Sequence, residues 1–226
     1  MSDILIRNND TRQGRKYMFI DLHIHEKTFS LDSKISLQDI VNAAKERGLD
    51  AVCITDHDHL GIREEAHRFS KEIGYPIFVG VEYYSLDGDL VTFGVNAIPD
   101  TRIPAQEYIN YVTSQGGVCY SAHPYRNNKR GLENKLATIT GLVGAEVLNA
   151  NTCREENNQA IEMAQKLGMQ QIGASDAHFY DRVGFYATYF PQQIKSEEDL
   201  INALKEGKCK AAYWTPNGYQ ILHGNL

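Results

Sequence analysis

Short apolar runs alternate with helix-like stretches along most of the chain, and this alternation constrains the fold more than any other feature. A helix is predicted over 36–48, because "SLQDIVNAAKERG" places apolar residues on one face and Gly48 fits a helix end. Ser36 and Asp39 form a capping box at its start. Similar patterns predict helices over 61–74, 104–117, 154–168 and 196–208. Strands that alternate with helices indicate an α/β fold with a parallel sheet, open or closed into a barrel.

Six of the predicted strands end in side chains that can bind metals or protons. The run "MFIDLHIH" ends in His23 and His25, "AVCITDHD" in Asp56, His57 and Asp58, and "IFVGVE" in Glu82. The run "GVCYSAH" ends in His123, "AEVLN" in Asn149, and "QIGASDAH" in Asp176 and His178. The chemistry of parallel sheets lies at the carboxyl ends of their strands. Because alternate residues of a strand project to the same side, His23 and His25 can face one ion. Agreement among six strand ends favours one shared site over separate structural histidines.

The expected metal ligands are imidazole and carboxylate groups, without any thiolate. They are His23, His25, His57, Glu82, His123, Asp176 and His178. This mixture suits zinc, manganese or iron better than calcium, which prefers oxygen ligands. One catalytic zinc ion takes about three protein ligands plus water. The sequence therefore predicts two or three divalent ions that share a carboxylate.

The motifs together resemble those of the polymerase and histidinol phosphatase (PHP) superfamily of metal-dependent phosphoesterases, in particular its small stand-alone bacterial members. "DLHIH", "ITDHD", "GVE", "AHP" and "SDAH" occur in the order typical of that family, and the resemblance runs from about 19 to 214. It implies a distorted seven-stranded (β/α) barrel of PHP type. We expect a single PHP domain over 1–226, with short extensions at both ends of the core.

The resemblance also implies a role for each expected ligand. His23, His25, Glu82 and Asp176 resemble the ligands of a first ion. Glu82 should bridge to a second ion held by His123, and His57 and His178 resemble ligands of a third.

Two positions depart from the usual family pattern. The family commonly has an acid or a histidine five or six residues after the HxH motif, but "HEKTFSLDS" is longer, and Asp32 is the nearest candidate for the third ion. Where the family often has "GHLL", this chain has "GDLV", so Asp89 replaces a histidine ligand. A carboxylate is a harder donor, which would bias the second position toward manganese or iron or weaken its occupancy.

The implied reaction is hydrolysis of a phosphate ester. Two close ions lower the pKa of a bridging water to about 7, and the resulting hydroxide would attack phosphorus in line. The expected catalytic residues are Glu82, Asp176, Asp56 and Arg126, with Asp56 orienting ligands from behind.

Phosphate binding is expected from residues in the loops that follow the strands. They are Arg126, Asn149 and Arg154. An arginine fork can bind two phosphate oxygens. For Lys129 and Arg130 the interpretation as solvated loop charges is favoured.

Several functions compete at this stage. A phosphatase or phosphodiesterase of small phosphate esters, with nucleotides as candidates, is favoured because the ligand set is nearly complete in 226 residues. An exonuclease or DNA-end processing enzyme would use the same ions, but the net charge of −6 and the lack of a basic stripe count against nucleic acid. A non-catalytic metal-binding domain ranks last, since only the Asp89 position is altered. The amidohydrolases usually need a lysine at a strand end, and we see none.

The sequence also indicates where such a protein would work. No apolar run approaches the length of about 20 residues that a membrane helix needs. Residues 1–17 show no export signal, and the four scattered cysteines suit a reducing compartment. We expect a cytoplasmic protein without a membrane partner.

Overall fold

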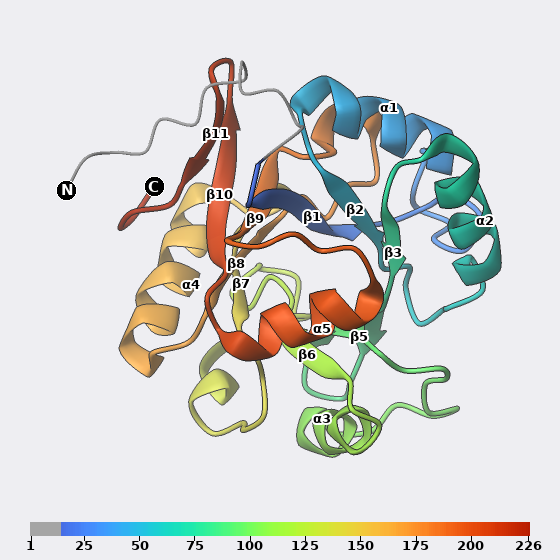
Figure 1. Cartoon of the computed structure of the whole chain (residues 1–226). Coiled ribbons are helices and arrows are strands. Elements are labelled where there is room, and N and C mark those ends of the chain that lie inside the picture. Colours follow the sequence, from blue (N-terminus) through green and yellow to red (C-terminus); the bar gives the residue numbers. More distant parts are fainter. Residues whose placement is uncertain (1–14) are drawn as a thin grey trace.

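The computed structural model describes residues 15–226, in which helices lie outside the strands (Figure 1). The helices of this part are α1 (Leu37–Arg47), α2 (Arg63–Ile73), α3 (Ala105–Ser114), α4 (Arg154–Leu167) and α5 (Glu197–Glu206), with short 3₁₀ helices η1 (Glu133–Ala137) and η2 (Tyr180–Arg182). The strands are β1 (Met18–Ile24), β2 (Ala51–Ile54), β3 (Ile77–Val79), β4 (Val81–Tyr84), β5 (Asp89–Phe93), β6 (Val118–Ser121), β7 (Ala145–Asn149), β8 (Gln171–Ala174), β9 (Tyr186–Phe190), β10 (Lys210–Thr215) and β11 (Gly218–Ile221). The expected lack of an export signal concerns a segment that lies mostly outside the described residues.

Helix α1 confirms the helix predicted from local signals. The Ser36 hydroxyl accepts a hydrogen bond from the Asp39 N–H (3.2 Å), and the Asp39 carboxylate accepts one from the Ser36 N–H (3.0 Å). Gly48 ends the helix in the left-handed conformation, with φ at 79°. Glycine adopts this conformation at little cost, so the helix stops there. Ile40 and Val41 are fully buried on its inner face, which fixes the helix against the sheet.

The strands of the described residues form two sheets. One has the order β11-β10-β9-β1-β2-β3 and the other β4-β5-β6-β7-β8. The α/β class is therefore confirmed, whereas the closed seven-stranded barrel is not confirmed. At the junctions between the sheets, isolated contacts replace continuous ladders. The Gly80 N–H donates to the Ile54 carbonyl (2.9 Å), and Ile24 and Ala177 form an isolated bridge.

The predicted parallel arrangement holds for only part of each sheet. Strands β1, β2 and β3 are parallel, as are β6, β7 and β8. Strands β4 and β5 are antiparallel, because residues 85–88 join them directly without a crossover helix. Strand β9 also runs antiparallel to both β1 and β10, and β10 to β11. The prediction of a parallel sheet is therefore confirmed only in part, since helices between strands do not by themselves decide strand direction.

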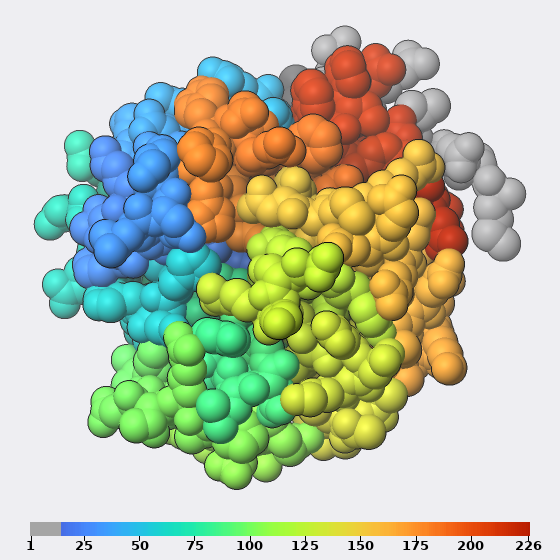
Figure 2. Space-filling model, turned by 180° about the vertical axis from the view of Figure 1, so that it is seen from behind, coloured from blue at the N-terminus to red at the C-terminus, as the bar shows by residue number. Residues whose placement is uncertain are grey.

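Segments from many parts of the chain meet on one face of the molecule. In the view from behind, blue, cyan, yellow-green, yellow and orange segments converge at the middle of this face (Figure 2). These colours cover the loops that follow β1, β2, β6, β7 and β8. In residues 15–226, no helix is both long and apolar enough to cross a bilayer.

Candidate metal centre

The histidines and carboxylates that end the strands meet in three overlapping groups. The groups are His23, His25 and Asp176; His25, His57 and His178; and Glu82, Asp89 and His123. Within each group the potential ligand atoms all lie within 4.8 Å of one another. We name the groups after the ions that they are expected to hold. The first group is His23, His25 and Asp176, the second is Glu82, Asp89 and His123, and the third is His25, His57 and His178. Together they form the candidate metal centre.

Glu82 lies where the three groups meet. Its Oε1 atom is 2.9 Å from His123 Nε2 and 3.4 Å from His23 Nε2. Its Oε2 atom is 2.6 Å from His57 Nδ1 and 3.5 Å from His25 Nε2. The side chain is 1% exposed, so this carboxylate is enclosed by four imidazoles. A carboxylate that contacts several groups at once suits the bridging role expected for Glu82.

The ring nitrogens of His23 and His25 test whether ions fit this centre. His23 Nδ1 is 3.1 Å from Glu146 Oε1, and His25 Nδ1 is 3.1 Å from Ser30 Oγ. In their neutral forms both histidines would carry the ring proton on Nδ1, facing these acceptors, and a lone pair on Nε2. The two Nε2 atoms lie 3.0 Å apart, so two such lone pairs could bind one ion, and the arrangement fits a metal.

Two more atoms of the centre lack hydrogen bonds. Glu82 Oε2 and His57 Nδ1 are buried and 2.6 Å apart, yet neither makes a hydrogen bond within the described residues. Buried polar atoms that make no hydrogen bond are rare because they are costly. Coordination of an ion would satisfy both atoms.

Burial and neighbouring charges set the protonation of the ligands. Burial lowers the pKa of His25 to about 3, so this imidazole is neutral, which is the form that binds metals. Burial would also lower the pKa of His57, but its contact with the Glu82 carboxylate outweighs this and raises it to about 9. Burial would raise the pKa of Glu82, but His23, His123 and His57 hold it well below its usual range. Glu82 is therefore ionised at neutral pH.

Asp32 joins the third group at its open edge. Its Oδ2 atom is 3.2 Å from His57 Nε2 and 3.3 Å from His178 Nε2. The other ring nitrogen of His178 donates to the Asp176 carbonyl (2.9 Å), which leaves its Nε2 free for an ion. The Asp32 side chain is 61% exposed. Asp32 thus lies beside nitrogens of two histidines of the third group, and its role as a ligand stays a prediction.

Two ligand candidates have an unusual backbone conformation. His123 has a φ of 23° and Asp176 a φ of 52°. Residues other than glycine seldom adopt positive φ, at a cost of order 1–3 kcal/mol each. Each residue comes two positions after the end of its strand, β6 or β8. Backbone strain of this kind concentrates at functional sites, which fits the placement of these two side chains in the centre.

The three residues expected to bind phosphate have different surroundings. Arg126 donates to Asn149 Oδ1 (2.6 Å) and to the Asp176 carboxylate, so both Arg126 and Asn149 border the centre. Arg154 is exposed and donates to the Leu226 carbonyl instead. Its role in phosphate binding stays a prediction, without support from these contacts.

Arg130 binds a carboxylate of the metal centre. Its Nε donates to Asp89 Oδ2 (2.7 Å), and its Nη2 donates to Asp89 Oδ1 (3.0 Å). The interpretation of Arg130 as a solvated charge was therefore wrong, because the guanidinium binds a buried carboxylate of the second group. Lys129, its neighbour, is exposed as expected.

Glu146 is a residue of the centre that sequence reasoning missed. Besides its contact with His23, it accepts hydrogen bonds from the His123 N–H (2.8 Å) and from Asn149 Nδ2 (2.7 Å). An acid inside the apolar run "GAEVLN" was a signal. However, simple alternation puts Glu146 and Asn149 on opposite faces, and only a register irregularity between Glu146 and Leu148 brings them together. Such a carboxylate orients a ligating histidine.

Ser30, also missed, connects Asp56 to His25. The Ser30 hydroxyl donates to Asp56 Oδ1 (2.8 Å) and lies against His25 Nδ1. The same Asp56 oxygen accepts from the Glu26 N–H (2.7 Å). Asp56 is fully buried, and burial raises its pKa to about 7. Asp56 thus lies behind the ligands, as expected for a residue that orients them.

Comparison with known proteins agrees with this geometry. An uncharacterised protein of Methanocaldococcus jannaschii is 29% identical over 142 residues, which cover 59% of this chain and 82% of that protein. A two-domain Bacteroides vulgatus protein, described as containing a predicted PHP-like metal-dependent phosphoesterase, superposes with a TM-score of 0.72 at 18% identity, over 89% of this chain and 66% of its own. A lesion-specific endonuclease of Pyrococcus furiosus gives a TM-score of 0.64 at 17% identity, over 91% of this chain and 57% of its own. At these identities the two structures show a shared fold alone.

Family models give the assignment. A model described as PHP-associated matches residues 154–209, and the model of the PHP domain matches residues 21–134. The latter segment includes both the HxH motif and His123, and it spans just over half of the chain. With that match and the ligand groups described above, the chain belongs to the PHP domain family.

Proposed function

We propose that this chain hydrolyses small phosphate esters, as a phosphatase or phosphodiesterase that depends on divalent metal ions. The observation that carries the proposal is the position of Glu82, a buried carboxylate within 3.5 Å of nitrogens from four histidines. These histidines come from the ends of β1, β2 and β6. Ligands from separate strands that converge on one bridging carboxylate suit a cluster of ions, as phosphoryl transfer requires.

Manganese, zinc or iron ions suit the donor set of nitrogen and oxygen atoms. The first group, with Glu82, and the third group, with Asp32, each offer a complete set of ligands. When bound, such ions activate a water molecule and offset the negative charge of the phosphoryl group.

The chain's own residues bind and orient the substrate. Arg126 uses Nε and Nη2 for its bonds to Thr152, Asn149 and Asp176, and its Nη1 makes no hydrogen bond within residues 15–226. Its side chain is 18% exposed, so a phosphate oxygen can reach that nitrogen. Asn149 also donates to Glu146, which keeps the amide oriented toward Arg126. Arg126 therefore holds the phosphate beside the ligands of the first group.

The test is hydrolysis by the metal-depleted protein after manganese is restored. We expect release of phosphate or of a nucleoside monophosphate from at least one member of a panel of nucleotides, sugar phosphates and phosphodiesters. His25→Gln removes a ligand that the first and third groups share, and it should abolish that activity. A protein shown to bind manganese that hydrolyses no member of the panel would contradict the proposal.

A second candidate is cleavage of nucleic acid by the same centre. The shared fold with the lesion-specific endonuclease favours it, while the net charge of −6 opposes it. Labelled single-stranded DNA and lesion-containing duplexes distinguish the two functions. Cleavage that disappears in His25→Gln would favour the nuclease, whereas cleavage that survives this substitution would reveal a contaminant.

A further inference from the structure

The second group differs from the other two in its partner. Asp89 is 1% exposed, and both of its carboxylate oxygens accept hydrogen bonds from Arg130, at 2.7 and 3.0 Å. The Asp89 N–H donates in turn to the Arg130 carbonyl (2.6 Å). The two residues are therefore joined through both side chain and main chain.

The segment that carries Arg130 is tightly packed. A Cβ atom added at Gly88 would lie 2.8 Å from the Gly131 carbonyl carbon, and one added at Gly131 would overlap the Pro124 carbonyl. The Arg130 guanidinium also lies over the Tyr84 ring, 4.5 Å from its centroid. The guanidinium is thus positioned by a carboxylate, a close backbone approach and an aromatic ring.

A fixed guanidinium at this place competes with a metal ion. Arginine stays protonated in proteins, so Arg130 keeps its positive charge. Asp89 Oδ2 lies 3.6 Å from His123 Nε2 and accepts a hydrogen bond from Arg130. An ion in the second group would place two cations against one buried carboxylate, where they would repel each other. The first group has a comparable contact from Arg126 on Asp176, but it contains two histidines, whereas the second group contains one.

We propose that the Arg130 guanidinium takes the place of the second ion, so that the chain works with two metal ions and one built-in cation. The inference rests on the proposed function. The ions occupy the two groups that contain His25, and Arg130 supplies positive charge on the Asp89 side of the phosphate. This role also explains "GDLV", because an aspartate pairs with a guanidinium through two oxygens and a histidine cannot.

The deciding measurement is the number and position of bound ions in the wild-type protein. The protein is saturated with manganese, dialysed and subjected to elemental analysis, and crystals are examined by anomalous scattering. We expect two equivalents, one in each group that contains His25, with Arg130 on Asp89. A third peak at Glu82, Asp89 and His123 with Arg130 displaced would overturn the inference. Two bound ions without hydrolysis of any phosphate ester would contradict the proposed function and leave the inference supported, whereas absence of bound ions would overturn both.

Variants of the loop provide a second measurement. Arg130→Gln should open the second group and raise the manganese content from two equivalents to three. Lys129→Gln removes the same charge from an exposed neighbour and should keep two. A folded Arg130→Gln protein that still binds two ions would overturn the inference. Arg130→Lys keeps the charge and should also keep two ions, and the anomalous map of the wild type decides the question if Arg130→Gln does not fold.

Discussion

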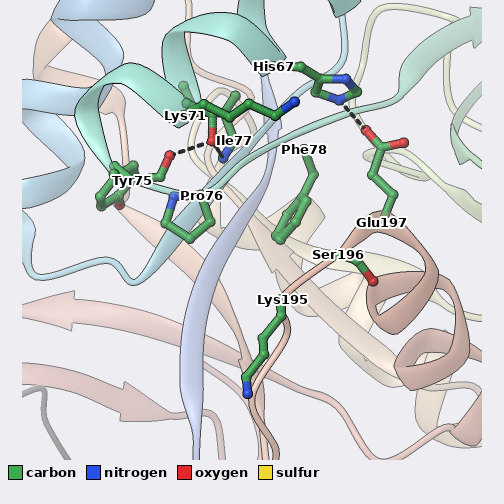
Figure 3. Close-up of a pocket in the computed structure, with 11 residues that line it drawn as sticks. His67, Lys71, Tyr75, Pro76, Ile77, Phe78, Lys195, Ser196 and Glu197 are labelled. Atoms are coloured by element: carbon green, nitrogen blue, oxygen red, sulfur yellow. Dashed lines mark hydrogen bonds and ion pairs between the residues drawn. The ribbon is translucent and has the colours of Figure 1, made fainter.

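Two histidine–carboxylate pairs in this molecule have nearly the same geometry and very different surroundings. His23 Nδ1 and Glu146 Oε1 are 3.1 Å apart in the metal centre, and both side chains are 0% exposed. His67 Nε2 and Glu197 Oε1 are 2.9 Å apart, with side chains 39% and 29% exposed. His67 and Glu197 line a pocket of about 500 Å³ between α2, β3 and the start of α5 (Figure 3). Lys71 and Lys195 line the same pocket.

The difference shows that neither a short distance nor a large pocket makes a metal site. Water competes for both partners of the exposed pair, so it contributes about 0–1 kcal/mol to the free energy of unfolding. Glu197 also accepts a hydrogen bond from the Val79 N–H (2.9 Å), which ties α5 to β3. In the metal centre, the contact between Glu146 and His23 is buried, so it orients the His23 ring as a ligand. The metal-ligand groups found in residues 15–226 all lie at this centre.

The largest effect is expected at Glu82, which lies at the middle of the metal centre. Glu82→Gln removes the carboxylate that contacts histidines of all three groups, so we expect loss of bound manganese and a fall in kcat/KM of more than about 100-fold, the upper limit for outer residues of metal sites. Glu197→Gln makes the same change beside the pocket and should alter neither quantity by more than about twofold. Elemental analysis and phosphate release measure the two effects. Manganese retained by Glu82→Gln at the wild-type level would contradict the bridging role.

Glu146 is the buried counterpart of Glu197, since each carboxylate contacts one imidazole nitrogen. Glu146→Gln keeps the shape of the side chain but removes the charge behind His23, so manganese affinity should fall by about 10- to 100-fold. Titration calorimetry measures the affinity, with Glu197→Gln as the matched control. Equal affinities in the two variants would mean that burial adds nothing to the His23–Glu146 pair.

Asp56 tests the energetic effect of burial at the centre. Burial raises its pKa from 3.8 to about 7, so between these values the folded metal-free protein retains a proton that the unfolded chain has lost. The free energy of unfolding therefore falls as pH rises through this range, by up to about 4 kcal/mol. Asp56→Asn cannot ionise, and at pH 8 it should be about 2–4 kcal/mol more stable than the wild type, with near equality at pH 4.

Denaturant unfolding in the presence of a chelator measures this dependence on pH. Glu197→Gln serves as the control, since its curve should stay parallel to that of the wild type. Parallel curves for Asp56→Asn and the wild type would show that Asp56 ionises normally in the folded protein.

The smallest effect is expected at the exposed pair. His67→Gln should lower the free energy of unfolding by less than about 1 kcal/mol and Tm by less than about 4 °C. Manganese binding should not change. Differential scanning calorimetry checks the first expectation, and a loss of bound manganese would link the pocket to the centre.

Most of the sequence predictions that the structure confirms depend on signals within a few residues. The capping box of Ser36 and Asp39 and the stop at Gly48 determine α1 locally, so they were readable before folding. The alternation in "DLHIH" likewise brought His23 and His25 to one place, because alternate residues of a strand project to the same side.

Local patterns of residues therefore specify the α/β class, the ends of helices such as α1, and which residue types can gather at the strand ends. Strand direction, the division into two sheets and the partners of the ligands depend on how the whole chain folds. Glu146 and His23 are 123 positions apart, and Arg130 and Asp89 are 41 apart. Contacts over such distances depend on sheet pairing and on register irregularities such as the one in β7. No local pattern of residues specifies these, because many long-range pairings are compatible with the same strands and helices.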